Sequence, residues 1–233
     1  MFNAIWDFFK GRKNSRILED IQRYSEELEN ITFVELEEKT KDLLFRMKTF
    51  LIEKKDNSDK FLEEFLIEVY AISKDFIRRE KNITLYPTQI LGSLNLNDGN
   101  LPEKATGEGK TLIAAPAACL NASAGMVVYI VTTNDFLAKR DWNINKPLFD
   151  FFNIESNVVL ETNTLEEKKN IYNNSKVIYT TPNLLFDYLN YNLLCKNKKN
   201  RIEIKFEYVI IDEIDSSLID NAQNPLRIST GLS

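Results

Sequence analysis

Apolar side chains recur at every third or fourth position through the first 80 residues, which is typical of amphipathic helices. Three stripes can be followed, at Ile17, Leu18, Ile21, Tyr24 and Leu28, at Leu36, Leu43, Leu44, Met47 and Leu51, and at Phe61, Leu62, Phe65, Leu66, Val69, Ile72 and Phe76. Thr32 and Glu35 have the spacing of a capping box before the second stripe, and the polar run 56–59 ends it. Only Gly11 interrupts the region, and no proline precedes residue 87. The pattern predicts a helical extension over residues 17–80.

Beyond residue 101, short apolar runs alternate with helical segments. The runs are residues 127–131, 157–160, 176–179 and 208–211. Thr164 with Glu167 forms a second capping box, and Thr181 precedes a proline at a first helical position. The apolar stretch 112–131 contains proline, glycine and polar residues, so we expect a helix, a turn and a strand there instead of a membrane span. Such alternation predicts an α/β fold with a parallel sheet covered on both faces.

The amino-acid composition argues against several kinds of functional site. The net charge of −5 argues against a general nucleic-acid-binding surface. The chain has no histidine, so histidine triads and histidine metal sites are excluded, and acid–base work falls to carboxylates or lysines. Cys119 and Cys195 are the only cysteines and are far apart, which argues against a disulfide framework or a zinc site and favours a reducing cytoplasm.

One short segment has the composition of a phosphate-binding loop. It consists of Thr106, Gly107, Glu108, Gly109, Lys110 and Thr111. Glycines let backbone N–H groups approach a phosphate chain, the lysine can reach the β- and γ-phosphates, and the Thr111 hydroxyl can ligate Mg²⁺. The apolar run that follows predicts a helix whose N-terminus faces the phosphates. Lys104 stands where the strict pattern has glycine, and this variant is typical of helicase-like motors.

Further residues complete a candidate Mg-ATP site. The apolar run 208–211 ends in Asp212 and Glu213, about 100 residues after Lys110. A parallel sheet would deliver Asp212 beside the phosphate loop to hold Mg²⁺, and Glu213 would orient or deprotonate the attacking water. Upstream, the Gln89 amide can read the adenine edge, and Tyr86 can lie against the ring.

These motifs together resemble the first nucleotide-binding domain of the SecA family, the ATP-driven motors of bacterial and plastid preprotein export. The resemblance covers nearly the whole chain and rests on four segments: Tyr86–Gly92, the phosphate loop, Val131–Asp141 with its Asn-Asp-Phe-Leu-Ala core, and the Asp-Glu-Ile-Asp-Ser run from Asp212 with the tail that follows it. Pro87-Thr88, Lys104-Ala105 and the looser Tyr179–Asn183 depart from the family pattern, which suggests an accessory or divergent member.

The resemblance implies a RecA-like P-loop domain over residues 81–230, with ATP and Mg²⁺ as cofactors. It implies an ATPase that moves unfolded preproteins through the SecYEG channel, located in the cytoplasm at the inner face of the plasma membrane, or in a plastid. Nucleic acid is not an expected partner, and a homodimer stays open. The chain stops at Ser233, where the family's preprotein cross-linking domain would begin. Without a second motor domain to supply arginines, we expect this chain to be incomplete and weakly active alone.

Residues 1–16 form an amphipathic N-terminal segment, with apolar residues on a short helix and a basic flank. This segment is expected either to associate with anionic membrane or to dock on the protein's own body. Two alternatives to the translocase motor remain. One is a superfamily 2 RNA helicase, which shares the phosphate loop and the Asp-Glu-x-Asp run; the other is a non-catalytic nucleotide- or translocon-binding remnant.

Overall fold

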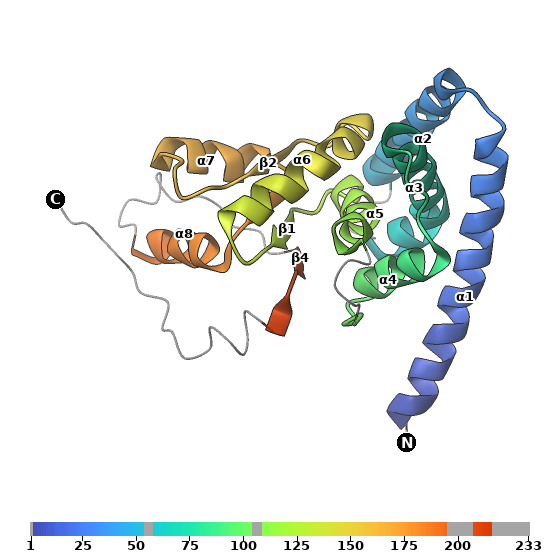
Figure 1. Ribbon diagram of the computed structural model, residues 1–233, viewed down its shortest axis with the longest axis horizontal. Helices are drawn as coiled ribbons and strands as arrows, with labels where there is room; N and C mark the ends of the chain where they lie inside the picture. Colours follow the sequence, from blue (N-terminus) through green and yellow to red (C-terminus); the bar gives the residue numbers. More distant parts are fainter. Residues whose placement is uncertain (1, 54–57, 104–108, 195–206, 216–233) are drawn as a thin grey trace. The chain divides into compact units, whose positions relative to one another are not determined.

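The structure is a computed structural model that describes residues 2–53, 58–103, 109–194 and 207–215. It is an α/β fold with a parallel four-stranded sheet and a helical N-terminal region, as the sequence predicts (Figure 1). The chain forms two compact units, which are described separately below. Unit 1 contains Met1–Ala124 and Phe151–Asn153, and unit 2 contains Gly125–Asp150 and Ile154–Ser233. The domain limits expected from the sequence, 1–16, 17–80 and 81–230, stay predictions.

Unit 1 is built from five helices in the part that the structure describes. They are α1 (Phe2–Glu29), α2 (Phe33–Glu53), α3 (Ser58–Lys81), α4 (Pro87–Asn97) and α5 (Lys110–Ser123). The first departs from the sequence prediction, because α1 is one continuous helix and not a short helix before residue 16 followed by a second. Gly11 lies inside it. A single glycine weakens a helix by about 1 kcal/mol but does not end it when helix-forming residues continue on both sides.

Aromatic side chains from α2 and α3 form the core between these two helices. Phe50 lies 5.6 Å from Phe61 and 5.6 Å from Phe65, measured between ring centroids, in edge-to-face geometry. Leu51, which belongs to the apolar stripe seen in the sequence, is 38% exposed. The buried positions of α2 are Leu36, Thr40, Leu43, Met47 and Phe50. These positions are four or three residues apart, so they lie on one narrow face of α2 that packs against α3. Phe50 belongs to this face, and the neighbouring Leu51 lies outside it.

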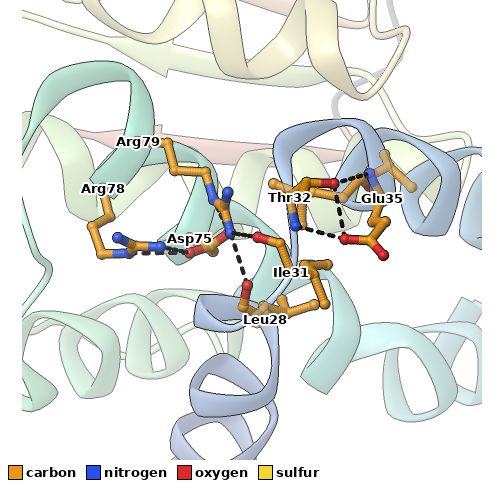
Figure 2. A network of polar contacts seen from close by, with 9 residues as sticks. Leu28, Ile31, Thr32, Glu35, Asp75, Arg78 and Arg79 are labelled. Carbon is orange, nitrogen blue, oxygen red and sulfur yellow. Dashed lines mark hydrogen bonds and ion pairs between the residues drawn. The ribbon is translucent and has the colours of Figure 1, made fainter.

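A polar network ties the end of α1 to α3 (Figure 2). The Asp75 carboxylate, whose side chain is 1% exposed, accepts hydrogen bonds from Arg78 and from Arg79. Arg79 also donates to the carbonyls of Leu28 and Ile31, both at 2.8 Å, where α1 ends. Arg79 thus binds one carbonyl in the last turn of α1 and one just beyond it, while it offsets a buried charge.

The capping box predicted before the second helix is confirmed. Thr32 N–H donates to Glu35 Oε2 at 2.7 Å, and Glu35 N–H donates to Thr32 Oγ1 at 3.2 Å. These hydrogen bonds hold the pKa of Glu35 below its usual range. The three-residue connection between α1 and α2 is therefore fixed on both sides, by Arg79 and by this box (Figure 2).

The helix, turn and strand predicted over residues 112–131 are confirmed. Residues 112–122 of α5 are buried without interruption, which accounts for their continuous apolar composition. After Gly125, at φ +96°, the chain enters the first strand. Among the described residues, no helix has both the length and the apolar character needed to cross a membrane.

Unit 2 contains the sheet and its covering helices. The described elements are β1 (Val128–Val131), α6 (Asp135–Phe151), β2 (Ser156–Val158), α7 (Leu165–Asn174), β3 (Val177–Thr180), α8 (Pro182–Leu194) and β4 (Tyr208–Ile211). All strand pairs are parallel, and their order is β2-β3-β1-β4. The four strands lie within a residue or two of their predicted positions. The second predicted capping box is also present, because Thr164 N–H donates to Glu167 Oε2 at 2.7 Å and Glu167 N–H returns a bond to Thr164 Oγ1.

Helices cover both faces of this sheet at β1 and β3, as predicted, whereas Val209 and Ile211 of β4 are exposed. On one face, Tyr129 and Ile178 are neighbours in register and pack with Tyr172 of α7 and Tyr188 of α8. The rings of Tyr172 and Tyr188 are stacked with centroids 3.7 Å apart. On the other face, Tyr179 contacts α6, since its hydroxyl accepts a 2.9 Å hydrogen bond from the Asn145 amide.

Candidate functional site

The described end of the phosphate loop lies at the start of α5. Gly109 is the residue before the helix and has a left-handed backbone, with φ +75° and ψ +33°. Leu112 N–H donates to the Gly109 carbonyl, so the helix begins immediately after the glycine. Lys110 and Thr111 form the first helical turn and are partly buried. Thr106, Gly107 and Glu108 lie outside the described residues, so their predicted roles stay predictions.

Gln89 lies directly against this glycine. A Cβ atom added at Gly109 would be 2.6 Å from Gln89 Nε2, so any larger residue would collide with the amide. The Gln89 Oε1 atom accepts a 2.8 Å hydrogen bond from Tyr86 N–H, which caps α4. Two segments far apart in sequence, residues 86–89 and 109–111, are therefore neighbours within unit 1. The sequence predicted only that both segments serve the same nucleotide, and the direct contact between them is visible in the structure alone.

Tyr86 is an exposed aromatic residue. Its side chain is 69% exposed, at the start of α4 and just before Pro87. The proline supplies a fixed φ at the first helical position, where no N–H is needed. An exposed ring beside Gln89 suits the predicted role against a nucleobase, which stays a prediction.

The residues of unit 1 fit a phosphate group. The first N–H groups of a helix have no intrahelical partners, and the helix dipole favours an anion at this end. Gly109 has no side chain to fill the space at that end, and its left-handed backbone costs glycine little. Lys110 adds a positive charge in the same turn, and Thr111 adds a hydroxyl. These features can bind an anion and, through Thr111, contribute one oxygen ligand to Mg²⁺.

Asp212 and Glu213 directly follow strand β4 in unit 2. Asp212 N–H donates to the Val131 carbonyl at 2.9 Å, which extends the β1–β4 pairing by one residue. Glu213 N–H then donates to Asp212 Oδ1 at 3.0 Å. Both residues thus lie at the carboxyl edge of the sheet, the edge at which parallel α/β folds bind their ligands.

Glu213 has an unfavourable backbone conformation. Three described residues other than glycine have positive φ: Asn82, Asn153 and Glu213, each between 53° and 54°. Asparagine tolerates this region, but a glutamate there costs about 1–2 kcal/mol. Strain of this kind is concentrated at functional sites. No local signal in the sequence indicates it, because glutamate does not mark a left-handed residue in the way glycine or asparagine does.

Several residues of the motif at 131–141 make contacts that stabilise the fold. Asn134 Oδ1 accepts from Leu137 N–H at 2.9 Å and caps α6. Asp135 accepts from Glu161 N–H at 2.7 Å, which links the first residue of α6 to the loop after β2. Asp141 is buried, with 4% of its side chain exposed, and is paired with Arg140. The motif is recognisable in the sequence, but these contacts are not.

The two halves of the candidate site belong to different units. Gln89, Lys110 and Thr111 are in unit 1, whereas Asp212 and Glu213 are in unit 2. The expectation that Asp212 lies beside the phosphate loop therefore stays a prediction. Within the described ranges, no cluster of three or more cysteine or acidic side chains is arranged to hold a metal ion.

Comparison with known proteins identifies the family. The model of the SecA DEAD-like domain matches residues 8–233. The chain is 38% identical over 229 residues to the protein translocase subunit SecA 2 of Streptococcus gordonii, covering 96% of this chain and 28% of that protein. It is 40% identical over 193 residues to the SecA subunit of Mycoplasma mycoides, covering 83% of this chain and 20% of that protein. The SecA subunit of Gracilaria tenuistipitata is 33% identical over 228 residues, which are 97% of this chain and 25% of the relative.

The chain thus spans about a quarter of the length of the curated relatives it matches. The matched region extends from the helical segment through the phosphate loop to the Asp-Glu run and beyond it. The family model and the identities of 33–40% agree with one another. The chain therefore belongs to the SecA family of protein translocase subunits.

Proposed function

We propose that this chain is the ATP-binding first motor domain of a SecA-type protein translocase. The observation that carries the proposal is the contact between Gln89 and Gly109 at the start of α5. It brings a side chain that can read a nucleobase next to a backbone that can bind phosphates, as one nucleotide requires. Membership of the SecA family supports the same assignment.

Residues of unit 1 would bind the nucleotide. Lys110 would contact the β- and γ-phosphates, and the backbone from Thr106 to Gly109 would surround them. The Gln89 amide would recognise the adenine edge while its oxygen keeps the bond to Tyr86 N–H. An amide oxygen has two lone pairs, so capping α4 and accepting from adenine are compatible. Tyr86 would lie against the base with its exposed ring.

The carboxylates of unit 2 would contribute the hydrolytic chemistry. Asp212, together with Thr111 of unit 1, would hold Mg²⁺, which neutralises charge on the phosphates when it is bound. Glu213 would orient or deprotonate the attacking water. Its left-handed backbone and the bond from its N–H to Asp212 Oδ1 fix the direction in which the chain leaves the sheet. The strain at Glu213 supports a role that selection keeps at a cost in stability.

Coupling to protein export is the wider part of the proposal. The partners would be unfolded preproteins and the SecYEG channel, with the protein in the cytoplasm at the inner membrane face or in a plastid. Residues 1–16 would bind anionic membrane, and their side chains up to residue 12 lie outside the described part of the chain. Membership of the translocase family removes the main support for the RNA-helicase alternative. The non-catalytic alternative is tested separately, by the phosphate-release experiment below.

Nucleotide binding tests the first step. A fluorescent ADP analogue is titrated into the wild-type chain and into Lys110→Ala, with Lys60→Ala as the control because Lys60 is an exposed lysine on α3 of the same unit. We expect Lys110→Ala to weaken binding at least tenfold and Lys60→Ala to leave it unchanged. Equal dissociation constants for all three proteins would refute the site assignment.

Phosphate release from Mg-ATP tests the catalytic step. Wild type is compared with Glu213→Gln and with Glu166→Gln, an exposed carboxylate on α7. Turnover that only Glu213→Gln abolishes supports a working site. Binding without turnover in any variant supports the non-catalytic alternative. Addition of SecYEG proteoliposomes and an unfolded preprotein then tests coupling, which predicts stimulation, whereas stimulation by RNA alone would contradict the translocase assignment.

A further inference from the structure

Helix α4 carries a row of polar residues that we call the α4 polar stripe. Its members, Gln89, Ser93 and Asn97, follow one another at intervals of four residues, so their side chains lie on the same side of the helix. The helix also buries Ile90 and Leu94, the apolar pair expected of a packed helix. α4 therefore packs within unit 1 through apolar side chains and through a polar stripe beside them.

The middle residue of the stripe is bound by Tyr70 of α3. Tyr70 Oη donates a 3.1 Å hydrogen bond to the Ser93 carbonyl, and Ser93 Oγ donates to Tyr70 Oη at 3.2 Å. Both residues are 0% exposed. A buried hydroxyl that lost these partners would cost stability, so the pair favours one position of α4. The contact lies one helical turn from Gln89.

The last residue of the stripe is bound by Asn121 of α5. The Asn121 amide, which is 2% exposed, donates to Asn97 Oδ1 and to the Ala117 carbonyl, both at 2.8 Å. The bond to Ala117 fixes the side chain on its own helix, so the bond to Asn97 fixes α4 relative to α5. The same helix α5 begins beside Gly109, the glycine that contacts Gln89. The two helices are therefore in contact near both ends of α4.

Helix α1 adds a contact where α4 ends. Asn14 of α1, which is 3% exposed, donates to Asp98 Oδ2 at 3.0 Å and to Asn95 Oδ1 at 3.3 Å. Side chains of α1, α3 and α5 thus make hydrogen bonds to a helix of 11 residues or to the residue that follows it. So many directional contacts on a short helix exceed what its burial alone requires.

These hydrogen bonds fix α4 more precisely than apolar packing can. Apolar contacts have no preferred direction, whereas a hydrogen bond weakens steeply when its atoms separate beyond about 3.2–3.5 Å. A side chain that recognises a ligand must be held within ~0.5 Å of its productive position. Gln89 lies in the first turn of α4, so any sliding or rotation of α4 on α5 would move its amide away from Gly109.

We propose that Tyr70 and Asn121 are positioning residues for nucleotide recognition. They fix the register of the α4 polar stripe on α3 and α5, and so fix the Gln89 amide at the distance from the phosphate loop that an adenine nucleotide spans. The inference rests on the proposed function, in which Gln89 reads the base. Tyr70 and Asn121 act through α4, so they determine how much the base contributes to binding and leave phosphate binding at the start of α5 unchanged.

Isothermal titration calorimetry with two ligands tests the proposal. ADP carries the base and phosphates, whereas inorganic tripolyphosphate carries phosphates alone. The full chain is compared with Tyr70→Phe, which keeps the ring, with Asn121→Ala and with the double variant. We expect the double variant to bind ADP about tenfold more weakly and each single variant about threefold, as for lost hydrogen bonds. The affinity for tripolyphosphate stays the same in all of them.

The Gln89→Ala background shows whether the two residues act through Gln89. Gln89→Ala alone weakens ADP binding about tenfold. In that background, Tyr70→Phe and Asn121→Ala cause no further loss of ADP affinity, because the group that they position is gone. Asn97→Asp keeps an acceptor for the Asn121 amide and therefore keeps the wild-type affinity for ADP.

Tyr24→Phe is the matched control for Tyr70→Phe. It removes a phenol hydroxyl from α1 of the same unit, beside Glu68 and Arg46, and leaves both affinities unchanged. Urea unfolding verifies that every variant is folded under the conditions of the titration.

Two kinds of failure can be distinguished. Equal losses of affinity for ADP and tripolyphosphate would overturn the inference, because they would indicate a general loosening of unit 1. Unchanged ADP binding in the double variant, or a loss that adds to that of Gln89→Ala, would overturn it as well, and these results leave the proposed function standing. Unchanged ADP binding in Gln89→Ala would instead refute the proposed role of Gln89, and the inference with it.

Discussion

Replacing Gly109 by alanine tests the contact that carries the proposed nucleotide site. The substitution adds one methyl group in a place where two things oppose it. The backbone at position 109 has φ +75°, which disfavours any residue with a Cβ atom. The new Cβ would also lie 2.6 Å from Nε2 and 3.8 Å from Cδ of Gln89. The Gln89 amide would have to move, and its oxygen would lose the bond from Tyr86 N–H.

The two costs are of similar size. The left-handed conformation costs alanine about 1–2 kcal/mol relative to glycine. Because the group in the way is the end of a flexible side chain, Gln89 can change rotamer, and the steric part reduces to the lost capping bond of about 0.5–1.5 kcal/mol. We expect Gly109→Ala to lower the free energy of unfolding of unit 1 by about 2–3 kcal/mol, and to weaken nucleotide binding through the displaced amide.

Gly99→Ala separates the two costs. Gly99 has nearly the same backbone, at φ +71°, but nothing lies within 4 Å of an added Cβ. Gly99→Ala should therefore lower the free energy of unfolding by the backbone cost alone. The double variant Gln89→Ala/Gly109→Ala should likewise be less stable than Gln89→Ala by the backbone cost alone. Urea unfolding followed by far-UV circular dichroism measures each value. If Gly109→Ala costs no more than Gly99→Ala, or costs the same with and without Gln89, the contact between the two segments does not exist.

Three further predictions concern the rest of the fold. Arg79→Met removes two bonds to the end of α1 and one partner of the buried Asp75 carboxylate, and should cost about 2–4 kcal/mol in urea unfolding. Arg23→Met, whose pair with Asp20 is exposed, should change stability by less than about 0.5 kcal/mol. Glu213→Gly relieves the left-handed backbone and should raise the free energy of unfolding by about 0.5–1 kcal/mol, while abolishing any ATP turnover; Glu213→Gln should lose turnover without that gain. Burial, helped by the charge of Glu207, raises the pKa of Tyr129 to about 12 from its ordinary 10.0, so the folded state favours the neutral phenol. The stability contributed by Tyr129 is therefore complete below the ordinary pKa and is lost as the pH rises through the folded value, and Tyr129→Phe should flatten that fall, whereas Tyr86→Phe, at an exposed ring, should not.

Local signals predicted most of the elements. Thr32 with Glu35 and Thr164 with Glu167 form the expected capping boxes, because a capping box depends on residues three positions apart and on little else. The four apolar runs form strands because they are short and rich in β-branched residues, and the two that form β1 and β3 are buried throughout. The parallel sheet follows from their alternation with helices.

Features that depend on distant partners were not predictable. Phe50 and Leu51 are both apolar, and only the facing rings of Phe61 and Phe65 decide that Phe50 is the buried one. Periodicity allows a stripe on α2 to drift by one position, which is enough to exchange these two. The burial of Asp75 has no local signal either, since nothing in the sequence around it shows that its partner Arg79 also reaches the end of α1.

The candidate site also combines features that the sequence predicts with features that it does not. Its residue types could be recognised in the sequence, because phosphate binding requires glycine, lysine and threonine at fixed spacing. The physical support for the site comes from two features without a local signal, the Gln89–Gly109 contact and the left-handed backbone of Glu213. The Gln89–Gly109 contact restricts substitution at position 109, and the left-handed backbone of Glu213 lowers stability. The other two described residues with a left-handed backbone, apart from glycines, are Asn82 and Asn153, and asparagine tolerates this conformation. A glutamate in the same conformation, at the end of a strand that pairs with β1, agrees with the catalytic role that we propose for its carboxylate.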